Sequence, residues 1–324
     1  MHVVSNVLEL VGRTPMVELS SGLNPTDVRI LMKVEMFNPG GSVKDRIGLA
    51  MVERAEREGK LEPGMTIVEP TSGNTGVGIA IAGRLKGYPL VVTIPDKMSQ
   101  EKIDLLRAYG AEVVVCRTDV EPENPESYYA VAERIAEERG GYVPNQYEHP
   151  ANPQAHYETT GPEIWEQTNG ELDAFVCGVG TGGTISGAGR YLKEQNENVQ
   201  VIGVDPEGSM IYTAFYGQPH DVDSYAVEGI GEDLVPETLD MSVIDEMIRV
   251  ADGESFRMTR RLVESEGLLI GGSCGAAVLG ALRYAEQLGS GTIATLLPDS
   301  GRNYIKRIYN DDWMRENGYL PDGS

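Results

Sequence analysis

Short apolar, β-branched segments alternate with longer segments of helical periodicity through most of the chain. This order is typical of βαβ units and predicts an α/β fold with mostly parallel sheets. Between the predicted strands, apolar residues recur at helical spacing, as in Ile47, Ala50, Met51 and Ala55. Seven strands are expected, too many for one small sheet: residues 30–34, 66–69, 90–94, 112–116, 174–179, 199–204 and 292–297.

A proline-rich stretch interrupts this pattern near the middle of the chain. Residues 144–153 read Pro-Asn-Gln-Tyr-Glu-His-Pro-Ala-Asn-Pro, which favours a break between domains. At 324 residues the chain is long enough for about two domains, and we place their junction near residue 150. Residues 311–324 are expected to form an exposed ending.

The charge balance disfavours nucleic acid and membrane surfaces as partners. With 50 acidic and 27 basic side chains the formal net charge is −23, which repels nucleic acid and anionic lipid. No apolar stretch is long enough to span a bilayer, and the first residues lack the pattern of a secretory signal. The three cysteines are widely spaced and suit a reducing compartment, so we expect a cytoplasmic protein. The four histidines show no metal-site spacing with them.

One lysine stands in an unusual position. Lys44 follows the turn Asn38-Pro-Gly-Gly-Ser-Val and enters the first turn of a predicted helix. The positive partial charge of a helix N-terminus disfavours the ammonium form of a lysine. An uncharged amine can form a Schiff base with an aldehyde cofactor. The alternative for a single lysine is a phosphate-binding or surface role.

Three further loops follow predicted strands or open predicted helices. Residues 71–76, Thr-Ser-Gly-Asn-Thr-Gly, collect hydroxyls, an amide and backbone N–H groups that suit a small carboxylate or phosphate. Residues 178–184, Gly-Val-Gly-Thr-Gly-Gly-Thr, form a nest of N–H groups for phosphate oxygens. At residues 271–275, Ser273 is either a ligand to a buried atom or a helix cap. Cys274 is expected to be a packed thiol, because no partnered histidine is evident.

The second of these loops also matches a dinucleotide-binding fingerprint. Gly178, Gly180 and Gly183 have G-x-G-x-x-G spacing, and Asp205 ends the next predicted strand. A protein that binds a nicotinamide dinucleotide without using Lys44 is therefore an alternative. Against it, a hydroxyl-rich loop suits the terminal phosphate of a small cofactor better than a bridging pyrophosphate. Three anion-binding loops together with Lys44 favour pyridoxal phosphate, with a second loop for an amino-acid carboxylate.

The four motifs resemble those of the cysteine synthase and cystathionine β-synthase family of fold-type II pyridoxal-phosphate enzymes. The likeness extends from about residue 7 to residue 313 and rests on Asn38-Pro-Gly-Gly-Ser-Val-Lys-Asp-Arg, Thr-Ser-Gly-Asn-Thr-Gly, Gly-Thr-Gly-Gly-Thr and Gly-Gly-Ser. Within that family, several segments look more like the cystathionine β-synthase catalytic core: residues 95–99, 152–160, 205–209, 227–231 and 297–304.

The resemblance implies a role for individual residues. Lys44 would hold the cofactor and act as the base at the substrate Cα, Asn74 would contact the ring oxygen, and Ser273 the pyridine nitrogen. The phosphate would be bound by Gly180, Thr181, Gly182, Gly183 and Thr184. The substrate would be bound by Thr71, Ser72, Gly73, Thr75, Gln146 and Gly229, with Tyr147 and Glu232 on the thiol side.

The resemblance also implies an architecture similar to that of the tryptophan synthase β-subunit. It consists of two three-layer α/β domains with mostly parallel, twisted sheets, assembled as a homodimer. Residues 42–150 would form a smaller, mobile domain with the carboxylate loop, and residues 1–41 and 151–315 a larger domain that binds the cofactor phosphate. Residues 316–324 would be a tail.

The activity implied is a β-replacement that condenses L-serine with L-homocysteine to give cystathionine and water. The alternative is cysteine synthesis from O-acetylserine, or another activated serine, and sulfide. One departure bears on this choice: Glu232 stands where animal enzymes of this kind carry tyrosine and cysteine synthases usually a small residue. Because the haem-binding extension and the regulatory domains are not present in this sequence, neither haem nor nucleoside-type regulation is expected.

Overall fold

The chain divides into two compact units. The smaller comprises Met1–Val11 and Asn38–Asn152, and the larger Gly12–Phe37 and Pro153–Ser324. The computed structural model describes residues 3–71, 73–96, 98, 100–117, 119–120, 124–219 and 222–321.

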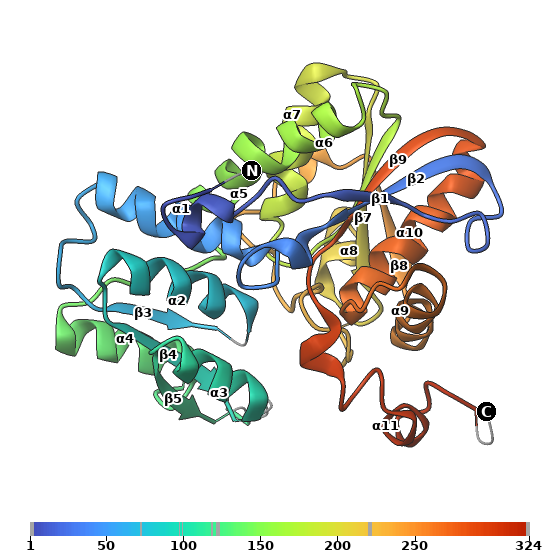
Figure 1. Cartoon of the computed structure of the whole chain (residues 1–324). Helices are drawn as coiled ribbons and strands as arrows, with labels where there is room; N and C mark the ends of the chain where they lie inside the picture. Colours follow the sequence, from blue (N-terminus) through green and yellow to red (C-terminus); the bar gives the residue numbers. More distant parts are fainter. Residues whose placement is uncertain are drawn as a thin grey trace. The chain divides into compact units, whose positions relative to one another are not determined.

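The larger unit is built on a six-stranded sheet with the order β1-β2-β9-β6-β7-β8 (Figure 1). The pairing of β1 with β2 is antiparallel, and the other four pairings are parallel. Parallel neighbours need crossover connections, which the helices supply. The strands are β1 (Met16–Glu18), β2 (Asp27–Val34), β6 (Ala174–Gly178), β7 (Gln200–Pro206), β8 (Glu246–Val250) and β9 (Ser290–Leu297).

Helices cover both faces of this sheet. Successive strand residues point to opposite sides, so Val176 packs with α10 while Phe175 and Cys177 pack with α7. Helix α9 lies on α10, and α6 lies beside α7. The result is a three-layer α/β arrangement. Its helices are α6 (Gly161–Gln167), α7 (Gly183–Gln195), α8 (Met210–Phe215), α9 (Asp252–Glu266), α10 (Gly272–Leu288) and α11 (Asp311–Glu316).

The smaller unit has a parallel sheet of three strands, in the order β3-β4-β5 (Figure 1). Val68 and Val91 pack against α4, whereas Ile67 and Val92 face glycines of α2 on the other side. This unit is therefore also layered. Its elements are β3 (Ile67–Pro70), β4 (Leu90–Pro95), β5 (Glu112–Cys116), α1 (Lys44–Arg57), α2 (Asn74–Lys86), α3 (Gln100–Ala108) and α4 (Tyr128–Arg139). Helix α5 (Ala151–Ala155) contains the point where the chain passes into the larger unit.

Helices α1 and α2 touch each other through their backbones. A Cβ atom at Gly48 of α1 would lie 2.5 Å from the carbonyl carbon of Gly78, and one at Gly78 would lie 2.6 Å from the carbonyl oxygen of Lys44. Neither position has room for a side chain. This contact fixes the first turn of α1, and with it Lys44, against the middle of α2.

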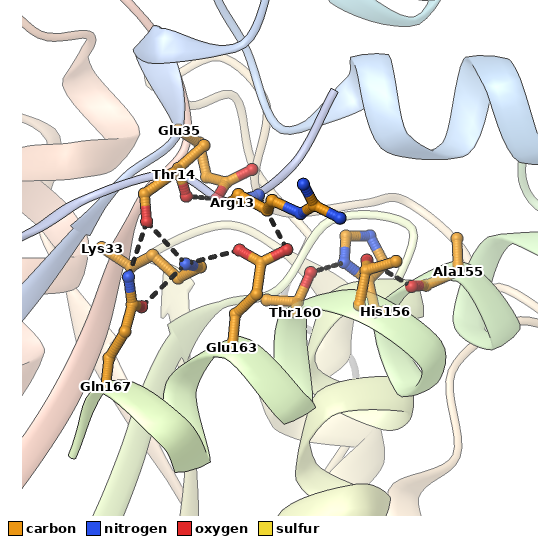
Figure 2. A network of polar contacts seen from close by, with 10 residues as sticks. Arg13, Thr14, Lys33, Glu35, Ala155, His156, Thr160, Glu163 and Gln167 are labelled. Atoms are coloured by element: carbon orange, nitrogen blue, oxygen red, sulfur yellow. Dashed lines mark hydrogen bonds and ion pairs between the residues drawn. The ribbon is translucent and has the colours of Figure 1, made fainter. Parts of the chain in front are cut away.

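A buried ion pair holds the start of the larger unit in place (Figure 2). Lys33 of β2 is fully buried, and its Nζ lies 2.7 Å from Oε2 of Glu163. The same ammonium donates to the carbonyl of Thr14 at 3.0 Å and to Oε1 of Gln167 at 2.9 Å. The other oxygen of Glu163 accepts the N–H of Arg13, whose φ of 49° is in the left-handed region. These bonds tie residues 13 and 14 to β2 and α6.

The predicted α/β class and all seven predicted strands are confirmed, with ends shifted by at most three residues. Two strands were missed. β1 has only three residues and lies at the sheet edge, and β8, Glu-Met-Ile-Arg-Val, lacks a continuous apolar run. The expectation of an exposed ending is confirmed at residues 311–312 and 316–318, but it was wrong for the apolar residues between and after them. Met314 is fully buried, and Tyr319 packs edge-on against Phe256 with ring centroids 4.9 Å apart.

Replacing Gly78 by Ala is expected to lower the free energy of unfolding by about 1–3 kcal/mol, because the added methyl group collides with the backbone of α1. Gly83→Ala on the same helix is the matched control. A Cβ there meets its nearest atom at 3.5 Å, so this change is expected to be neutral or stabilising by about 0.5–1 kcal/mol. Urea unfolding of both variants checks this. Equal effects of the two substitutions would contradict the close contact.

Candidate active site

The phosphate loop predicted at residues 180–184 lies between β6 and α7 of the larger unit. Gly182 immediately precedes α7 and has a φ of 79°, which favours glycine. A Cβ at Gly180 would lie 2.7 Å from the carbonyl oxygen of Gly229. The carbonyl of Thr181 accepts a hydrogen bond from the hydroxyl of Thr238 at 2.5 Å, which holds the loop in place. The loop therefore presents backbone N–H groups at a helix N-terminus, an arrangement that binds anions.

Ser273 belongs to the same neighbourhood. Its residue is nearly fully buried in the first turn of α10, which is preceded by Gly271 and has no side-chain cap. The alternative that Ser273 caps this helix is therefore wrong. Gly229 has a φ of 89°, and a Cβ built there would meet only the hydroxyl oxygen of Ser273, at 3.9 Å. Gly180, Gly229 and Ser273 are thus brought close together, and the side-chain position at Gly229, beside the Ser273 hydroxyl, is unfilled.

The predicted carboxylate loop lies in the smaller unit, where β3 leads into α2. Asn74 is the first residue of α2, and Thr71 accepts the N–H of Gly73 at 3.3 Å. The hydroxyl of Thr75 donates to Oε1 of Gln146 at 2.6 Å, and both residues are buried. The structure therefore brings together two residues 71 positions apart, and the amide N–H groups of Gln146 are left to donate to another acceptor. Ser72 lies outside the described residues.

Lys44 is the first residue of α1, as its sequence context predicts. Its backbone N–H donates to the hydroxyl of Ser42 at 3.2 Å. The next residue, Asp45, accepts the N–H of Gly40, which closes the turn that leads into the helix. Lys44 therefore stands at a helix N-terminus on a firmly held turn.

Tyr147 and Glu232 are each held by hydrogen bonds of their backbone. The N–H of Tyr147 donates to Oδ1 of Asn145 at 3.2 Å, and Asn145 itself has a φ of 52°. The backbone of Glu232 bonds to the start of α8: its N–H donates to Oγ of Ser209 at 3.1 Å, and its carbonyl accepts the N–H of Met210 at 2.9 Å.

The geometry weakens one alternative from the sequence and agrees with the expectation for Cys274. Asp205 ends the strand after the glycine fingerprint, where a dinucleotide site carries a ribose-binding acid, but it is fully buried and accepts the N–H of Tyr212 at 2.8 Å. It is not placed to bind a ribose. Cys274 is also fully buried, and burial raises the pKa of its thiol well above the ordinary value. A thiol of this kind is a packed group and not a nucleophile.

A further buried acid, Glu69, was not recognised in the sequence. It lies in β3, two residues before the carboxylate loop begins, and is fully buried. Within the described chain, neither carboxyl oxygen has a hydrogen-bond partner at ordinary bonding geometry. Burial raises the pKa of Glu69 to about 8, and the facing backbone N–H of Asn145 offsets this only in part. Glu69 is therefore neutral at pH 7 and adds no negative charge beside the carboxylate loop.

The protein-family model for pyridoxal-phosphate dependent enzymes matches residues 7–299. The chain belongs to this family. Among curated proteins it is 44% identical to the cystathionine β-synthase of Dictyostelium discoideum and 46% identical to that of Oryctolagus cuniculus, over 98% and 99% of its own length. It covers 64% and 59% of those two proteins. It is also 44% identical to the cysteine synthase of Staphylococcus aureus strain Mu50, over 95% of this chain and 98% of that protein.

Solved structures agree with the family. An O-ureido-L-serine synthase superposes with a TM-score of 0.89 at 35% identity and covers 100% of this chain and 98% of its own. A hydrogen sulfide-producing enzyme from Fusobacterium nucleatum gives 0.85 at 36% identity, over 93% of this chain and 100% of its own. The prediction of a fold-type II pyridoxal-phosphate enzyme is confirmed.

The residues of the larger unit fit the cofactor that the family implies. A pyridoxal phosphate needs donors for a dianionic phosphate, space for a flat ring and a partner for the ring nitrogen. The N–H groups that open α7 meet the first need, and Gly229 with Ser273 meets the other two.

Replacing Glu69 by Gln is expected to stabilise the protein increasingly as pH rises. The unfolded chain ionises this carboxyl near its ordinary pKa of 4.5, whereas the folded chain keeps its proton to about pH 8. The native state binds more protons in this window, so wild-type stability falls from pH 4.5 to about pH 8 and then levels off. Each unit of pKa shift corresponds to about 1.4 kcal/mol. Urea unfolding of both proteins between pH 5 and pH 9 measures the gap.

Asp205→Asn is the control for this experiment. Burial raises the pKa of Asp205 to about 6, so the advantage of this variant is expected to stop growing near pH 6. A Glu69→Gln advantage that stays constant from pH 5 to pH 9 would show that Glu69 is ionised in the folded protein.

Proposed function

We propose that the protein condenses L-serine with L-homocysteine to give L-cystathionine and water. The observation that supports β-replacement is Ser273, a buried residue that does not cap α10 and whose hydroxyl lies beside Gly229. A neutral hydroxyl cannot stabilise a protonated pyridine nitrogen as a carboxylate would. The ring is then a weaker electron sink, and loss of the β-substituent competes well against racemisation and transamination.

Lys44 carries the proton transfers of the proposed reaction. Pyridoxal phosphate, when bound through Lys44, supplies the electron sink that acidifies the substrate Cα. The amine of Lys44, once released, takes the Cα proton and becomes an ammonium group. Hydroxide is a poor leaving group, so this ammonium gives its proton to the departing serine hydroxyl, which leaves as water. The neutral amine of Lys44 then takes the S–H proton of homocysteine, the sulfur forms the new C–S bond at the β-carbon, and Lys44 returns this proton to Cα.

The remaining predicted residues hold the reactants. Asn74 contacts the ring oxygen of the cofactor, and Gly180, Thr181, Gly182, Gly183 and Thr184 bind its phosphate. Thr71, Ser72, Gly73 and Thr75 hold the amino-acid carboxylate together with Gln146, whose position is supported by its 2.6 Å bond to Thr75. Gly229 lines the substrate space, with Tyr147 and Glu232 on the thiol side.

The relatives support two assignments of the substrates. The two cystathionine β-synthases named above are 44% and 46% identical, but the chain spans only about three fifths of their length. The cysteine synthase of S. aureus matches at 44% over nearly its whole length. This match favours a second candidate function, which is cysteine synthesis from O-acetylserine, or another activated serine, and sulfide. Acetate is a better leaving group than hydroxide, so this reaction depends less on Lys44 as a proton donor.

We also propose that the enzyme is a cytoplasmic homodimer. Support for a reducing compartment comes from Cys116, Cys177 and Cys274, which are all buried and form no disulfide. Within the described residues, no helix has the length and apolar content that crossing a membrane would require.

Borohydride reduction of the purified protein tests the role of Lys44. We expect a yellow protein that bleaches on reduction and carries a covalent cofactor adduct on Lys44, detected by mass spectrometry of the digested chain. Lys44→Ala is expected to give no adduct and to lose at least 1,000-fold in kcat, because proton transfer and covalent attachment are lost together. An adduct on a different lysine would refute the assignment.

A comparison of substrate pairs separates the two candidate reactions. We expect kcat/KM for serine with homocysteine to exceed that for O-acetylserine with sulfide, with cystathionine measured by chromatography and mass spectrometry. The reverse order would establish cysteine synthesis as the function and leave the cofactor assignment intact.

A further inference from the structure

A buried histidine connects the phosphate loop to a distorted helical turn. His156 is 1% exposed, and its Nε2 lies 3.2 Å from the hydroxyl oxygen of Thr184, in the first turn of α7. On the other side of the ring, Nδ1 lies 2.9 Å from the hydroxyl oxygen of Thr160, which is fully buried (Figure 2). The imidazole thus bridges two hydroxyls, one of which belongs to the proposed phosphate site.

The backbone around His156 is unusual. Residues 156–160 form a π-helical turn, in which the N–H of Gly161 bonds back to the carbonyl of His156. Such turns are rare and are often found at functional sites. The turn packs directly on α7: a Cβ at Gly187 would lie 2.0 Å from the carbonyl oxygen of Pro153 and 2.9 Å from Cβ of His156. This contact lies one helical turn after Thr184, so the position of the imidazole relative to Thr184 is fixed.

The direction of the two hydrogen bonds follows from the chemistry of the groups. A hydroxyl has one proton, and Thr184 must direct it at the phosphate if it is to act as a donor there. Its oxygen must then accept a proton from Nε2 of His156. In a neutral imidazole Nδ1 is therefore an acceptor, and the hydroxyl of Thr160 donates to it. With the opposite tautomer, Thr184 would give its proton to the ring and turn a lone pair toward the phosphate.

We propose that His156 is a positioning residue for the cofactor phosphate, which it serves by orienting the hydroxyl of Thr184. The inference rests on the proposed phosphate role of residues 180–184. The chain Thr160 to His156 to Thr184 delivers one charge-assisted hydrogen bond to the phosphate in a fixed direction. His156 acts through Thr184 and touches no reacting atom.

Two substitutions of the histidine separate its two contacts. The amide of Gln reaches the position of Nε2 and keeps a donor for Thr184, whereas the amide of Asn reaches only the position of Nδ1. We expect His156→Asn to weaken cofactor binding by about tenfold, the range for one hydrogen bond to a charged group. His156→Gln is expected to stay within about threefold of wild type. The measurements are the cofactor dissociation constant, from absorbance of the diluted holoenzyme, and the ³¹P resonance of the bound phosphate, which shifts in the Asn variant.

Repeating the His156 substitution in a Thr184→Val variant distinguishes orientation of the Thr184 hydroxyl from packing of the core. If His156 acts through Thr184, His156→Asn is expected to cost less than about twofold further in that background. Equal losses in the Asn and Gln variants, or the same loss with and without the Thr184 hydroxyl, would show that His156 only packs the core and would overturn the inference. Thermal unfolding of each variant gives the structural effect separately. Absence of an adduct on Lys44 would refute both the proposed function and this inference. If the adduct is present but the losses in cofactor affinity from His156→Asn and Thr184→Val simply add, only this inference is refuted.

Discussion

Backbone contact at glycine positions is the constraint on which the site depends. Where a Cβ would lie 2.5–2.7 Å from another residue's backbone, as at Gly48, Gly78 and Gly180, the chain cannot accept a side chain without moving. The first two contacts set the start of α1 against α2, and the third sets the phosphate loop against Gly229. Both proposed halves of the chemistry, the amine and the anion site, are therefore placed by main-chain packing and not by loops free to adjust.

Much of this arrangement could be predicted from the sequence because it is local. A β-branched run and the glycine-rich turn after it are read from neighbouring residues, so β6 was expected to within one residue. The position of Lys44 at a helix start was predictable for the same reason. The pyridoxal-phosphate family followed from four motifs together, which no single motif could establish.

The rest depends on contacts that sequence spacing does not contain. Glu69 resembles an ordinary acid in a strand, and its neutral state arises from burial by the surrounding residues. His156 lies in a segment with a familiar sequence, but the π-helical turn that aims its ring at Thr184 has no periodic signature. Strand β8 carries two charged residues among five, and its pairing with β7 is a long-range contact that its own sequence does not indicate.

The buried Lys33 and Glu163 pair affects how the protein responds to ionic strength. Many of its other ion pairs lie at the surface, such as Arg29 with Glu18 and Arg117 with Asp119, where dissolved salt screens them. The same salt relieves the self-repulsion of a chain with a net charge of −23. Because Lys33 is buried, dissolved salt screens its pair with Glu163 much less than it screens the surface pairs. The bonds that hold residues 13 and 14 to β2 and α6 therefore depend little on ionic strength.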